Sequence, residues 1–353
     1  MRYSCYARDM KIGVVGASGY SGGELLRLIL GHPHFELEYI AGGSSAGSRI
    51  TSVHPGLAPL SERVFEETSV VRINDCELIF LALPHGESAK LVAQIAESTK
   101  IVDLGADFRL HSSHSWEKYY GGAHAGTWAY GLSELPGVAR TIAASNRVAN
   151  PGCYATSIIL AAAPLISNNL IESDDIVVVA ASGTTGAGRK PTARLLASEV
   201  MGSLTSYKFG GVHQHTPEIE EVLQTLSPGS ASDVKVSFTP ILAPMPRGIL
   251  ATTSAKLIQH IKTEALRELF ADFYSNSPFV QVLRHDQLPM TSAVIGSNSV
   301  QIQIAVDEHT NRVVVSSALD NLGKGAASAA IQNANLMSGF EPALGLSITG
   351  IGA

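Results

Sequence analysis

An apolar run followed by evenly spaced glycines, close to the start of the chain, limits the possible folds more than any other feature. Residues 11–16 read Lys-Ile-Gly-Val-Val-Gly, and residues 16–22 have the spacing G-x-x-G-x-x-G ahead of an amphipathic stretch that stops at Gly31 and Pro33. Glycines let the backbone turn tightly and approach a pyrophosphate, and the following helix presents free N–H groups and its positive dipole end. The pattern predicts a Rossmann turn that binds a dinucleotide, although a purely structural turn would share it. The predicted contacts are Gly16, Ser18, Gly19, Tyr20, Ser21 and Gly22.

The end of the second predicted strand, residues 36–40, indicates which dinucleotide is bound. An NAD enzyme usually places Asp or Glu there to hold the ribose hydroxyls. Residues 41–49 contain no carboxylate but offer Ser44, Ser45 and Arg49. Hydroxyls and a guanidinium suit the additional 2′-phosphate, so NADP(H) is favoured. The alternative is that these residues form a flexible polar loop.

Strands and helices alternate through the first part of the chain. Continuous apolar runs at residues 78–83 and 101–104 are typical of strands covered on both faces. Alternation of such strands with helices predicts an α/β, Rossmann-type, doubly wound parallel sheet.

The pattern changes after about residue 150, and 353 residues are too many for one ordinary core. Strand-like runs here follow one another, which predicts a second α+β domain with a mixed sheet. The last helical stretch, residues 325–337, is rich in Ala, Gly and Ser and is expected to return to the first domain. We predict an NADP-binding domain of residues 1–151 and 325–353, and a catalytic, substrate-binding domain of residues 152–324. Expected strands are 176–181, 234–240, 300–306 and 312–318, and expected helices are 217–226 and 264–273.

Composition argues against several other functions. The formal net charge of −6, without a dense Lys/Arg cluster, argues against a nucleic-acid partner. No apolar run reaches the roughly 18–20 residues of a membrane span, and residues 157–166 are better interpreted as a buried helix. Residues 1–9 lack the apolar region of a secretory signal and read as a short tail. Three cysteines with no metal-ligand spacing fit a reduced, cytoplasmic protein.

The heptapeptide Asn-Pro-Gly-Cys-Tyr-Ala-Thr at residues 150–156 suggests a nucleophile. A Pro-Gly turn leads into an apolar helical run, so Cys153 is expected at a helix N-terminus. There the dipole and free amides would stabilise the thiolate and lower the thiol pKa, and a thiolate attacks acyl centres. A buried, inert cysteine is the alternative. Cys76 opens a predicted strand and reads as core, and Cys5 lies in the tail.

Two histidines in the segment 211–218 offer a base for this nucleophile. His213 and His215 stand two residues apart, so on an extended segment they face the same way. Thr216 is a good N-cap and Pro217 a good first helical residue, which would hold the pair at a strand-to-helix corner with Glu218 in the first turn. A two-histidine metal site is the rival interpretation, but no third ligand stands at a recognisable spacing, so no metal is expected.

Taken together, these motifs resemble the N-acetyl-gamma-glutamyl-phosphate reductases of arginine biosynthesis, and more distantly the aspartate-semialdehyde dehydrogenases. The resemblance spans almost the whole chain, and the pairing of NPGCYAT with HxHTPE is specific. The motifs that match in order are GASGYSG (16–22), LPHG (83–86), DLGADFRL (103–110), NPGCYAT (150–156), SGTTGAGR (182–189), HQHTPEIE (213–220) and DNLGKGAASAAIQ (320–332).

The resemblance implies roles for single residues. It makes Cys153 the nucleophile and His215 the acid/base, with His213, Arg109 and Glu218 as substrate contacts. The fork of Arg109 could hold a substrate carboxylate bidentately, although an ion pair with Asp107 or another neighbour is the alternative. Backbone amides at Cys153 and the amide of Asn150 are candidates to stabilise an oxyanion. By analogy, further cofactor contacts are Pro84, Ser182, Gly183 and Gly186, and Asn321 at the nicotinamide carboxamide.

The reaction that follows is reductive dephosphorylation of N-acetyl-L-glutamyl 5-phosphate to N-acetyl-L-glutamate 5-semialdehyde. Cys153 attacks the acyl phosphate and expels inorganic phosphate, NADPH reduces the thioester, and His215 moves the protons. The resemblance also implies a cytoplasmic homo-oligomer, a dimer or tetramer assembled through the second domain.

Three alternatives remain. The same chemistry could act on an aspartyl phosphate, or on the aminoadipyl phosphate that is one methylene longer, and a methylene is worth only a few kcal/mol of discrimination. A non-catalytic NADP-binding sensor would keep the glycine turn, but it has no reason to keep a cysteine at a helix start together with paired histidines.

Overall fold

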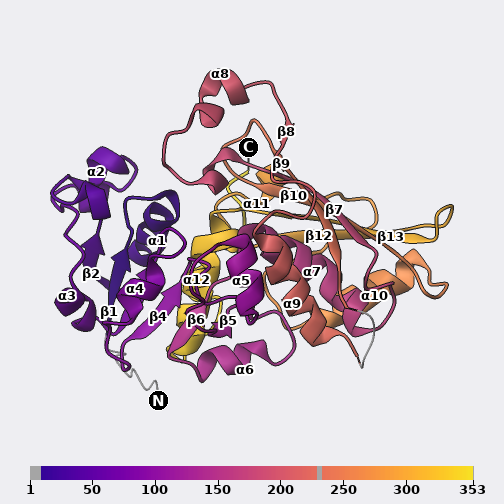
Figure 1. Cartoon of the computed structure of the whole chain (residues 1–353), viewed down its shortest axis with the longest axis horizontal. Coiled ribbons are helices and arrows are strands. Elements are labelled where there is room, and N and C mark those ends of the chain that lie inside the picture. The colour runs from indigo at the N-terminus through magenta and orange to yellow at the C-terminus, as the bar shows by residue number, and fades with distance from the viewer. Residues whose placement is uncertain (1–8, 229–232, 353) are drawn as a thin grey trace, which may run out of the picture.

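The protein is described by a computed structural model for residues 9–228 and 233–352. Cys5 and nearly all of the predicted N-terminal tail lie outside the described residues. Two sheets organise the chain, one from the N-terminal half and one from the C-terminal half (Figure 1). The predicted fold class, a doubly wound parallel sheet with a second α+β unit around a mixed sheet, is confirmed.

The first sheet has six parallel strands in the order β2-β1-β3-β4-β6-β5. From β1 the chain goes to β2 on one side and later to β3 on the other, so the strand order reverses at β1. In open α/β sheets ligands bind at such a switch point, at the carboxyl ends of the strands. The glycine turn begins there, at Gly16. The strands are β1 (Met10–Val15), β2 (Phe35–Ala41), β3 (Leu78–Leu81), β4 (Lys100–Asp103), β5 (Ala129–Tyr130) and β6 (Arg147–Ala149).

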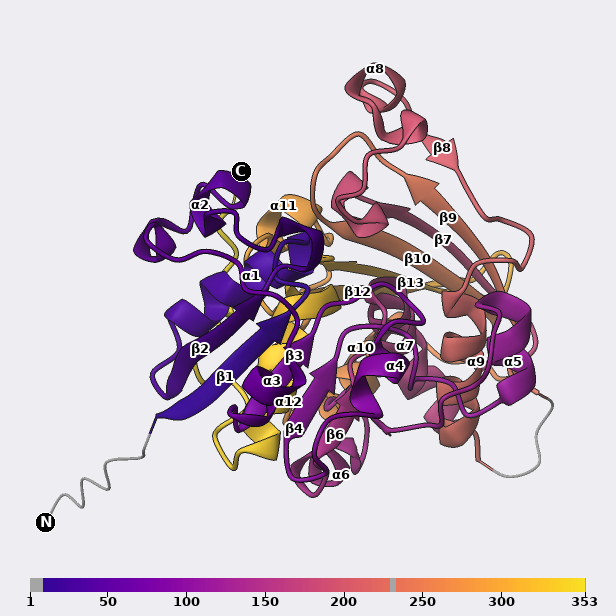
Figure 2. The same cartoon turned by 60° about the vertical axis from the view of Figure 1, so that its left-hand side comes forward.

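Helices cover both faces of this sheet. On one face, α12 (Ser328–Met337) packs beside α1 (Tyr20–Leu30) and α6 (Val138–Ala143) and contacts β4, although it comes from the far end of the chain (Figure 2). On the other face Cys76 is buried in an apolar cluster, as predicted. The remaining helices of this half are α2 (Ile50–Val53), α3 (Val70–Asn74), α4 (Ser88–Val92) and α5 (Ser113–Tyr119).

The second sheet has seven strands in the order β11-β12-β13-β10-β7-β9-β8 and mixes parallel with antiparallel pairs. Its strands are β7 (Ile176–Ser182), β8 (Thr205–Ser206), β9 (Val236–Leu242), β10 (Ile249–Lys256), β11 (Val280–Val282), β12 (Val300–Asp307) and β13 (Arg312–Leu319). Short helices α8 (Ala197–Val200) and α11 (Thr291–Val294) join some of them. The segment that carries α8 and β8 projects from the body of the molecule in both views (Figures 1 and 2).

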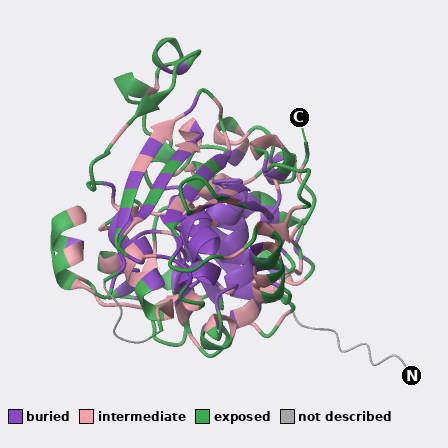
Figure 3. Ribbon diagram, turned by 90° about the vertical axis from the view of Figure 1, so that its right-hand side faces the viewer, coloured by how far each residue is buried: buried purple, intermediate pink, exposed green. Residues whose placement is uncertain are grey.

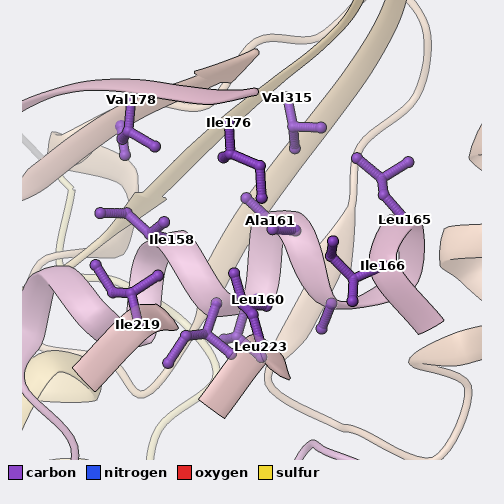
Figure 4. Packing of buried hydrophobic residues seen from close by; sticks show 14 of the residues in the cluster. Ile158, Leu160, Ala161, Leu165, Ile166, Ile176, Val178, Ile219, Leu223 and Val315 are labelled. Carbon is purple, nitrogen blue, oxygen red and sulfur yellow. The ribbon is translucent and has the colours of Figure 1, made fainter. Parts of the chain in front are cut away.

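A buried helix, α7 (Cys153–Ser167), packs on the inner face of this sheet, with α9 (His215–Leu226) beneath it and α10 (Thr263–Phe273) nearby. Figure 4 shows Ile158 and Ala161 of α7 facing Ile176 and Val178 of the sheet. The predicted buried helix at residues 157–166 is thus confirmed. Within the described residues, no helix is both long and apolar enough to cross a membrane.

A π-helical turn, η5 (Gly323–Ala327), joins the second sheet to α12. A Cβ at Gly325 would come 2.7 Å from the Cβ of Cys153, so the glycine lets this turn press against the start of α7. The Ala/Gly-rich sequence of this segment therefore permits a close backbone approach beside the candidate nucleophile.

Candidate active site

Cys153 is the first residue of α7, and Gly152 is its N-cap, so the predicted helix start is confirmed. The side chain is half-buried. Burial raises the pKa of the Cys153 thiol to about 11, although the backbone amides of Tyr154 and Cys153 itself favour the thiolate. In the free protein burial outweighs the helix terminus, and the sequence-based expectation of a lowered thiol pKa was wrong.

His215 is the first residue of α9, and its imidazole lies against the turn that precedes Cys153. A Cβ on Gly152 would stand 2.5 Å from Nε2 of His215, so only glycine leaves room for the ring. The pKa of His215 is well below its usual value, first because of burial and then because of the positive charge of Arg109. A neutral imidazole is the form that can accept a proton from a thiol.

His213 supports the start of α9. Its Nδ1 accepts a hydrogen bond from the backbone N–H of His215 at 3.1 Å, and the two rings lie 4.9 Å apart. Tyr154, Tyr207 and Phe238 surround the His213 ring. Burial lowers the pKa of His213 to about 2, so the ring is neutral and its Nδ1 is an acceptor. These contacts indicate a supporting role, and the predicted contact of His213 with substrate stays a prediction.

Glu218 and Arg109 form a buried ion pair at 3.2 Å, with side-chain exposures of 1% and 4%. The second oxygen of Glu218 accepts from the backbone N–H of Gly152 at 2.7 Å and from the hydroxyl of Tyr130 at 2.7 Å. Arg109 also donates to the carbonyls of Asn150 and Leu104, each at 2.8 Å. Three of its nitrogens thus bond to protein, which matches the ion-pair alternative with Glu218 as partner instead of Asp107.

Asn150 holds neighbouring backbone in place. Its side-chain nitrogen donates to the carbonyl of Ala326 in the π-helical turn at 3.1 Å, and its side-chain oxygen accepts from Asn333 at 3.0 Å. The Gly152 amide is likewise occupied by Glu218. The backbone amides at Cys153 and Tyr154 are therefore better placed than Asn150 to stabilise an oxyanion on a substrate at the thiol.

His85, in the LPHG segment, belongs near this group although the sequence reasoning gave it no role. Its Nδ1 accepts from the backbone N–H of Ala106 at 3.2 Å, and its ring meets Tyr120 edge-on at 5.3 Å. Desolvation and then the charge of Arg109 lower the pKa of His85 to about 4. A single histidine without a paired spacing gives no local signal in the sequence for such a position. In the described part of the chain, no three His, Cys, Asp or Glu side chains gather as metal ligands do.

The glycine turn has the geometry that a pyrophosphate needs. Gly16 has φ +82°, and a Cβ there would come 2.3 Å from the carbonyl of Ala82. A Cβ at Gly22 would come 2.5 Å from the carbonyl of Gly16. Gly19 is the N-cap of α1 and, among the described residues, no side chain caps its first amides. The helix terminus is therefore open to an anion. The Ser18 hydroxyl donates to the carbonyl of Gly42 at 2.9 Å, which joins the turn to the end of β2.

The loop after β2 carries the residues predicted to bind a 2′-phosphate, and that contact stays a prediction. Ser44 and Arg49 are exposed and Ser45 is half-buried. The guanidinium of Arg49 contacts the carbonyl of Ser61 at 3.0 Å and Glu62 at 3.6 Å. Both members of that ion pair are largely exposed, so Arg49 can exchange Glu62 for a phosphate at small cost.

The loop that follows β7 is held by Asn321. The side-chain oxygen of Asn321 accepts from the Gly248 amide at 2.8 Å, and its nitrogen donates to the Thr185 hydroxyl at 3.0 Å. A Cβ at Gly183 would come 2.7 Å from the carbonyl of Pro246, and Gly186 lies beside the Ser182 hydroxyl. The structure thus brings together the predicted cofactor contacts Asn321, Ser182, Gly183 and Gly186. Pro84, predicted for the same role, follows β3 in the first half of the chain. A contact between Asn321 and a nicotinamide stays a prediction.

Comparison with known families covers both halves of the chain. Residues 11–142 match the family described as semialdehyde dehydrogenase, NAD binding domain, and residues 153–321 match semialdehyde dehydrogenase, dimerisation domain. An N-acetyl-gamma-glutamyl-phosphate reductase of Acidothermus cellulolyticus is 55% identical over 97% of this chain and 98% of its own length. One of Salinispora arenicola is 53% identical over 97% of this chain and 99% of its own length.

Solved structures show a shared fold at lower identity. Aspartate semialdehyde dehydrogenase II of Vibrio cholerae has a TM-score of 0.69 at 17% identity, covering 94% of this chain and 98% of its own. Aspartate semialdehyde dehydrogenase of Candida albicans, determined with NADP, has a TM-score of 0.66 at 15% identity, covering 94% and 98%.

Proposed function

The chain belongs to the N-acetyl-gamma-glutamyl-phosphate reductase family, and from this membership we propose that it reduces N-acetyl-L-glutamyl 5-phosphate to N-acetyl-L-glutamate 5-semialdehyde, a step of arginine biosynthesis. The observation that carries the proposal is the position of the neutral imidazole of His215 against Gly152, the residue that precedes Cys153 at the start of α7. The family supplies the identity of the substrate, and a thiol and an imidazole on adjoining helix starts supply the chemistry for an acyl phosphate.

The catalytic steps follow from the protonation states. The thiol of Cys153 and the imidazole of His215 are both neutral at rest, so the thiol proton passes to His215 as sulfur attacks the acyl carbon. The C–O bond to phosphate breaks, inorganic phosphate leaves with that proton, and a thioester forms on Cys153. Bound NADPH would supply the hydride that reduces the acyl carbon. Sulfur then leaves that carbon as the aldehyde forms, and the Cys153 thiol is restored by a proton delivered through His215.

The residues of the glycine turn would hold the cofactor. Open amides at the start of α1 suit the pyrophosphate, and Ser44, Ser45 and Arg49 suit a 2′-phosphate. The absence of a carboxylate at the end of β2, within residues 41–49, favours NADP(H) over NAD(H).

The outer face of the second sheet supports self-association. Val177, Val179 and Leu250 are exposed on this face, where strands alternate between buried and exposed positions (Figure 3). Met201 and Phe209, in the projecting segment, are 75% and 65% exposed. An apolar surface of this kind is typical of subunit contacts, and we propose a homodimer or homotetramer assembled through it. Light scattering of the purified chain would measure its mass.

Two expectations from the sequence are proposals as well. The boundary of the NADP-binding unit, residues 1–151 and 325–353, is supported by the packing of α12 beside α1 and α6. A reducing, cytoplasmic location is supported by Cys76 and Cys153, which are both free thiols.

The test is phosphate-dependent reduction of NADP⁺ with three semialdehydes compared side by side. We expect N-acetylglutamate semialdehyde to have the highest kcat/KM, with aspartate semialdehyde and the aminoadipate homologue well below it. A preference for either of the others would replace the substrate assignment. No turnover with any of them, but intact NADPH binding, would favour a non-catalytic sensor.

A variant separates chemistry from binding. Cys153→Ser is expected to abolish turnover and to leave the Kd for NADPH unchanged. Cys76→Ala serves as the control, because Cys76 is buried in an apolar cluster that does not include Cys153. This variant should keep its activity. Near-normal turnover of Cys153→Ser would contradict the mechanism.

A further inference from the structure

Arg189 comes from the loop that follows β7 in the second half of the chain, yet its side chain reaches the glycine turn of the first half. Its guanidinium donates to the carbonyl of Ser18 at 3.4 Å, across 171 residues of sequence. The same guanidinium lies 5.9 Å from the centre of the Tyr20 ring. Ser18 and Tyr20 flank Gly19, the N-cap of α1, so the charge of Arg189 stands at the open end of that helix.

The charge of Arg189 has no carboxylate partner among the described residues, unlike that of several other arginines. Arg27 pairs with Glu24 at 2.8 Å, and Arg247 pairs with Glu24 at 2.9 Å. Arg49, in the loop after β2, pairs with Glu62 at 3.6 Å. Arg189 is exposed, and its guanidinium contacts a carbonyl oxygen and an aromatic face.

His54, a titratable group that faces this position, adds no anion. His54 contacts the carbonyl of Ala17 through Nε2 at 2.9 Å, and its ring lies against Gly23 of α1. Burial, and then the charge of Arg189, lower the pKa of His54. The open amides of α1 and the guanidinium of Arg189 therefore form one positive site, and within the described chain no carboxylate pairs with that guanidinium.

We propose that Arg189 binds the pyrophosphate of the dinucleotide, so that the loop of residues 182–189 closes on the cofactor from the second half of the chain. This inference rests on the proposed binding of NADP(H) at the glycine turn. A guanidinium fork matches phosphate oxygens, and the weak 3.4 Å contact with Ser18 can be exchanged for a charge-assisted one. The pyrophosphate is the favoured group because Ser18 and Tyr20 border the helix terminus, whereas the 2′-phosphate is assigned to the loop that carries Arg49.

Equilibrium titration of the cofactor-free protein with NADPH and with NADH, read by ligand fluorescence or calorimetry, tests the assignment. For Arg189→Ala we expect the Kd of both nucleotides to rise about tenfold or more, and by similar factors, because both carry the pyrophosphate. Arg49→Ala should raise the Kd of NADPH alone. Lys190→Ala is the matched control, since it removes a neighbouring exposed charge of the same loop, and both of its Kd values should match those of the unaltered chain.

The outcomes are distinct. Unchanged affinities for Arg189→Ala, a loss confined to NADPH, or an equal loss in Lys190→Ala would each overturn the assignment to the pyrophosphate. If the unaltered chain binds neither nucleotide, the proposed function fails instead, before any variant is compared.

Discussion

The carboxylate of Glu218 accepts a hydrogen bond from the backbone N–H of Gly152 at 2.7 Å, which ties the first turn of α9 to the residue before the candidate nucleophile. The same carboxylate pairs with Arg109, and Arg109 in turn donates to the carbonyl of Asn150 at 2.8 Å. One buried ion pair thus holds both sides of the turn that leads into Cys153. These bonds fix the backbone that carries the thiol beside the start of α9, where His215 lies.

Replacing Glu218 by Gln should destabilise the protein strongly. The substitution keeps the shape but leaves the buried guanidinium of Arg109 without a counter-charge, and breaking a buried pair in this way costs about 3–5 kcal/mol. Urea unfolding would measure the change in the free energy of unfolding.

An exposed pair supplies the control for Glu218→Gln. Glu62 pairs with Arg49 at 3.6 Å, and their side chains are 87% and 62% exposed. Glu62→Gln should change the free energy of unfolding by less than about 1 kcal/mol. Equal effects of the two substitutions would show that the Arg109–Glu218 pair contributes no more than a surface pair.

Gly152→Ala should impair catalysis without unfolding the chain. The new Cβ would stand 2.5 Å from Nε2 of His215, so the imidazole must move away from Cys153. Displacement of a catalytic group by about 1 Å can lower kcat roughly a hundredfold, and the Kd for NADPH should not change. Gly56→Ala is the matched control, because a Cβ there meets no atom within 4 Å. An unaltered kcat in Gly152→Ala would show that His215 takes no part in the reaction.

The elements that the sequence predicted are those with strong apolar patterns. β3 and α7 are buried almost throughout, and their runs of Leu, Ile and Ala were recognised as a covered strand and a buried helix. β10 lies in the middle of the second sheet and was missed. Its inward side chains include Ala251, Thr253 and Ala255, which are too small or too polar to stand out, although they alternate with exposed residues.

The residues of the candidate site also divide into those with a local pattern in the sequence and those without one. Cys153 and His215 could be found because a helix start and a paired spacing are local patterns in the sequence. The ion pair of Arg109 with Glu218 joins residues 109 positions apart, and no local pattern announces it. The thiol pKa was misjudged for a related reason, since a helix terminus can be read from the sequence but the burial that opposes it comes from distant segments.

Acid should destabilise the protein partly through His213. Its pKa is about 2 in the folded chain, against an ordinary value near 6.5, so the unfolded chain binds more protons below pH 6.5. The stability present above pH 6.5 is therefore lost as the pH falls, by about 1.4 kcal/mol per pH unit for this group.

The variant His213→Asn isolates that contribution. Asn keeps an oxygen that can accept from the His215 amide but takes up no proton, so between pH 7 and pH 5 it should lose about 2 kcal/mol less than the unaltered chain. His285→Asn, at a side chain that is 82% exposed, is the matched control for the substitution itself. Identical pH profiles for His213→Asn and the unaltered chain would show that His213 is not held neutral by burial.

The reactivity of Cys153 in the free protein should rise steeply with pH. Since burial raises the pKa of its thiol to about 11, only a small fraction is thiolate near neutrality. In a Cys5→Ser, Cys76→Ala background, the logarithm of the rate of alkylation by iodoacetamide should therefore climb about one unit per pH unit from pH 7 to 9.5. For N-acetylcysteine, measured alongside, the logarithm of the rate should level off at a lower pH because no protein surrounds its thiol. A plateau for Cys153 below pH 8 would mean that the amides at the start of α7 outweigh burial, and that the enzyme holds a preformed thiolate instead of transferring its proton to His215 during attack.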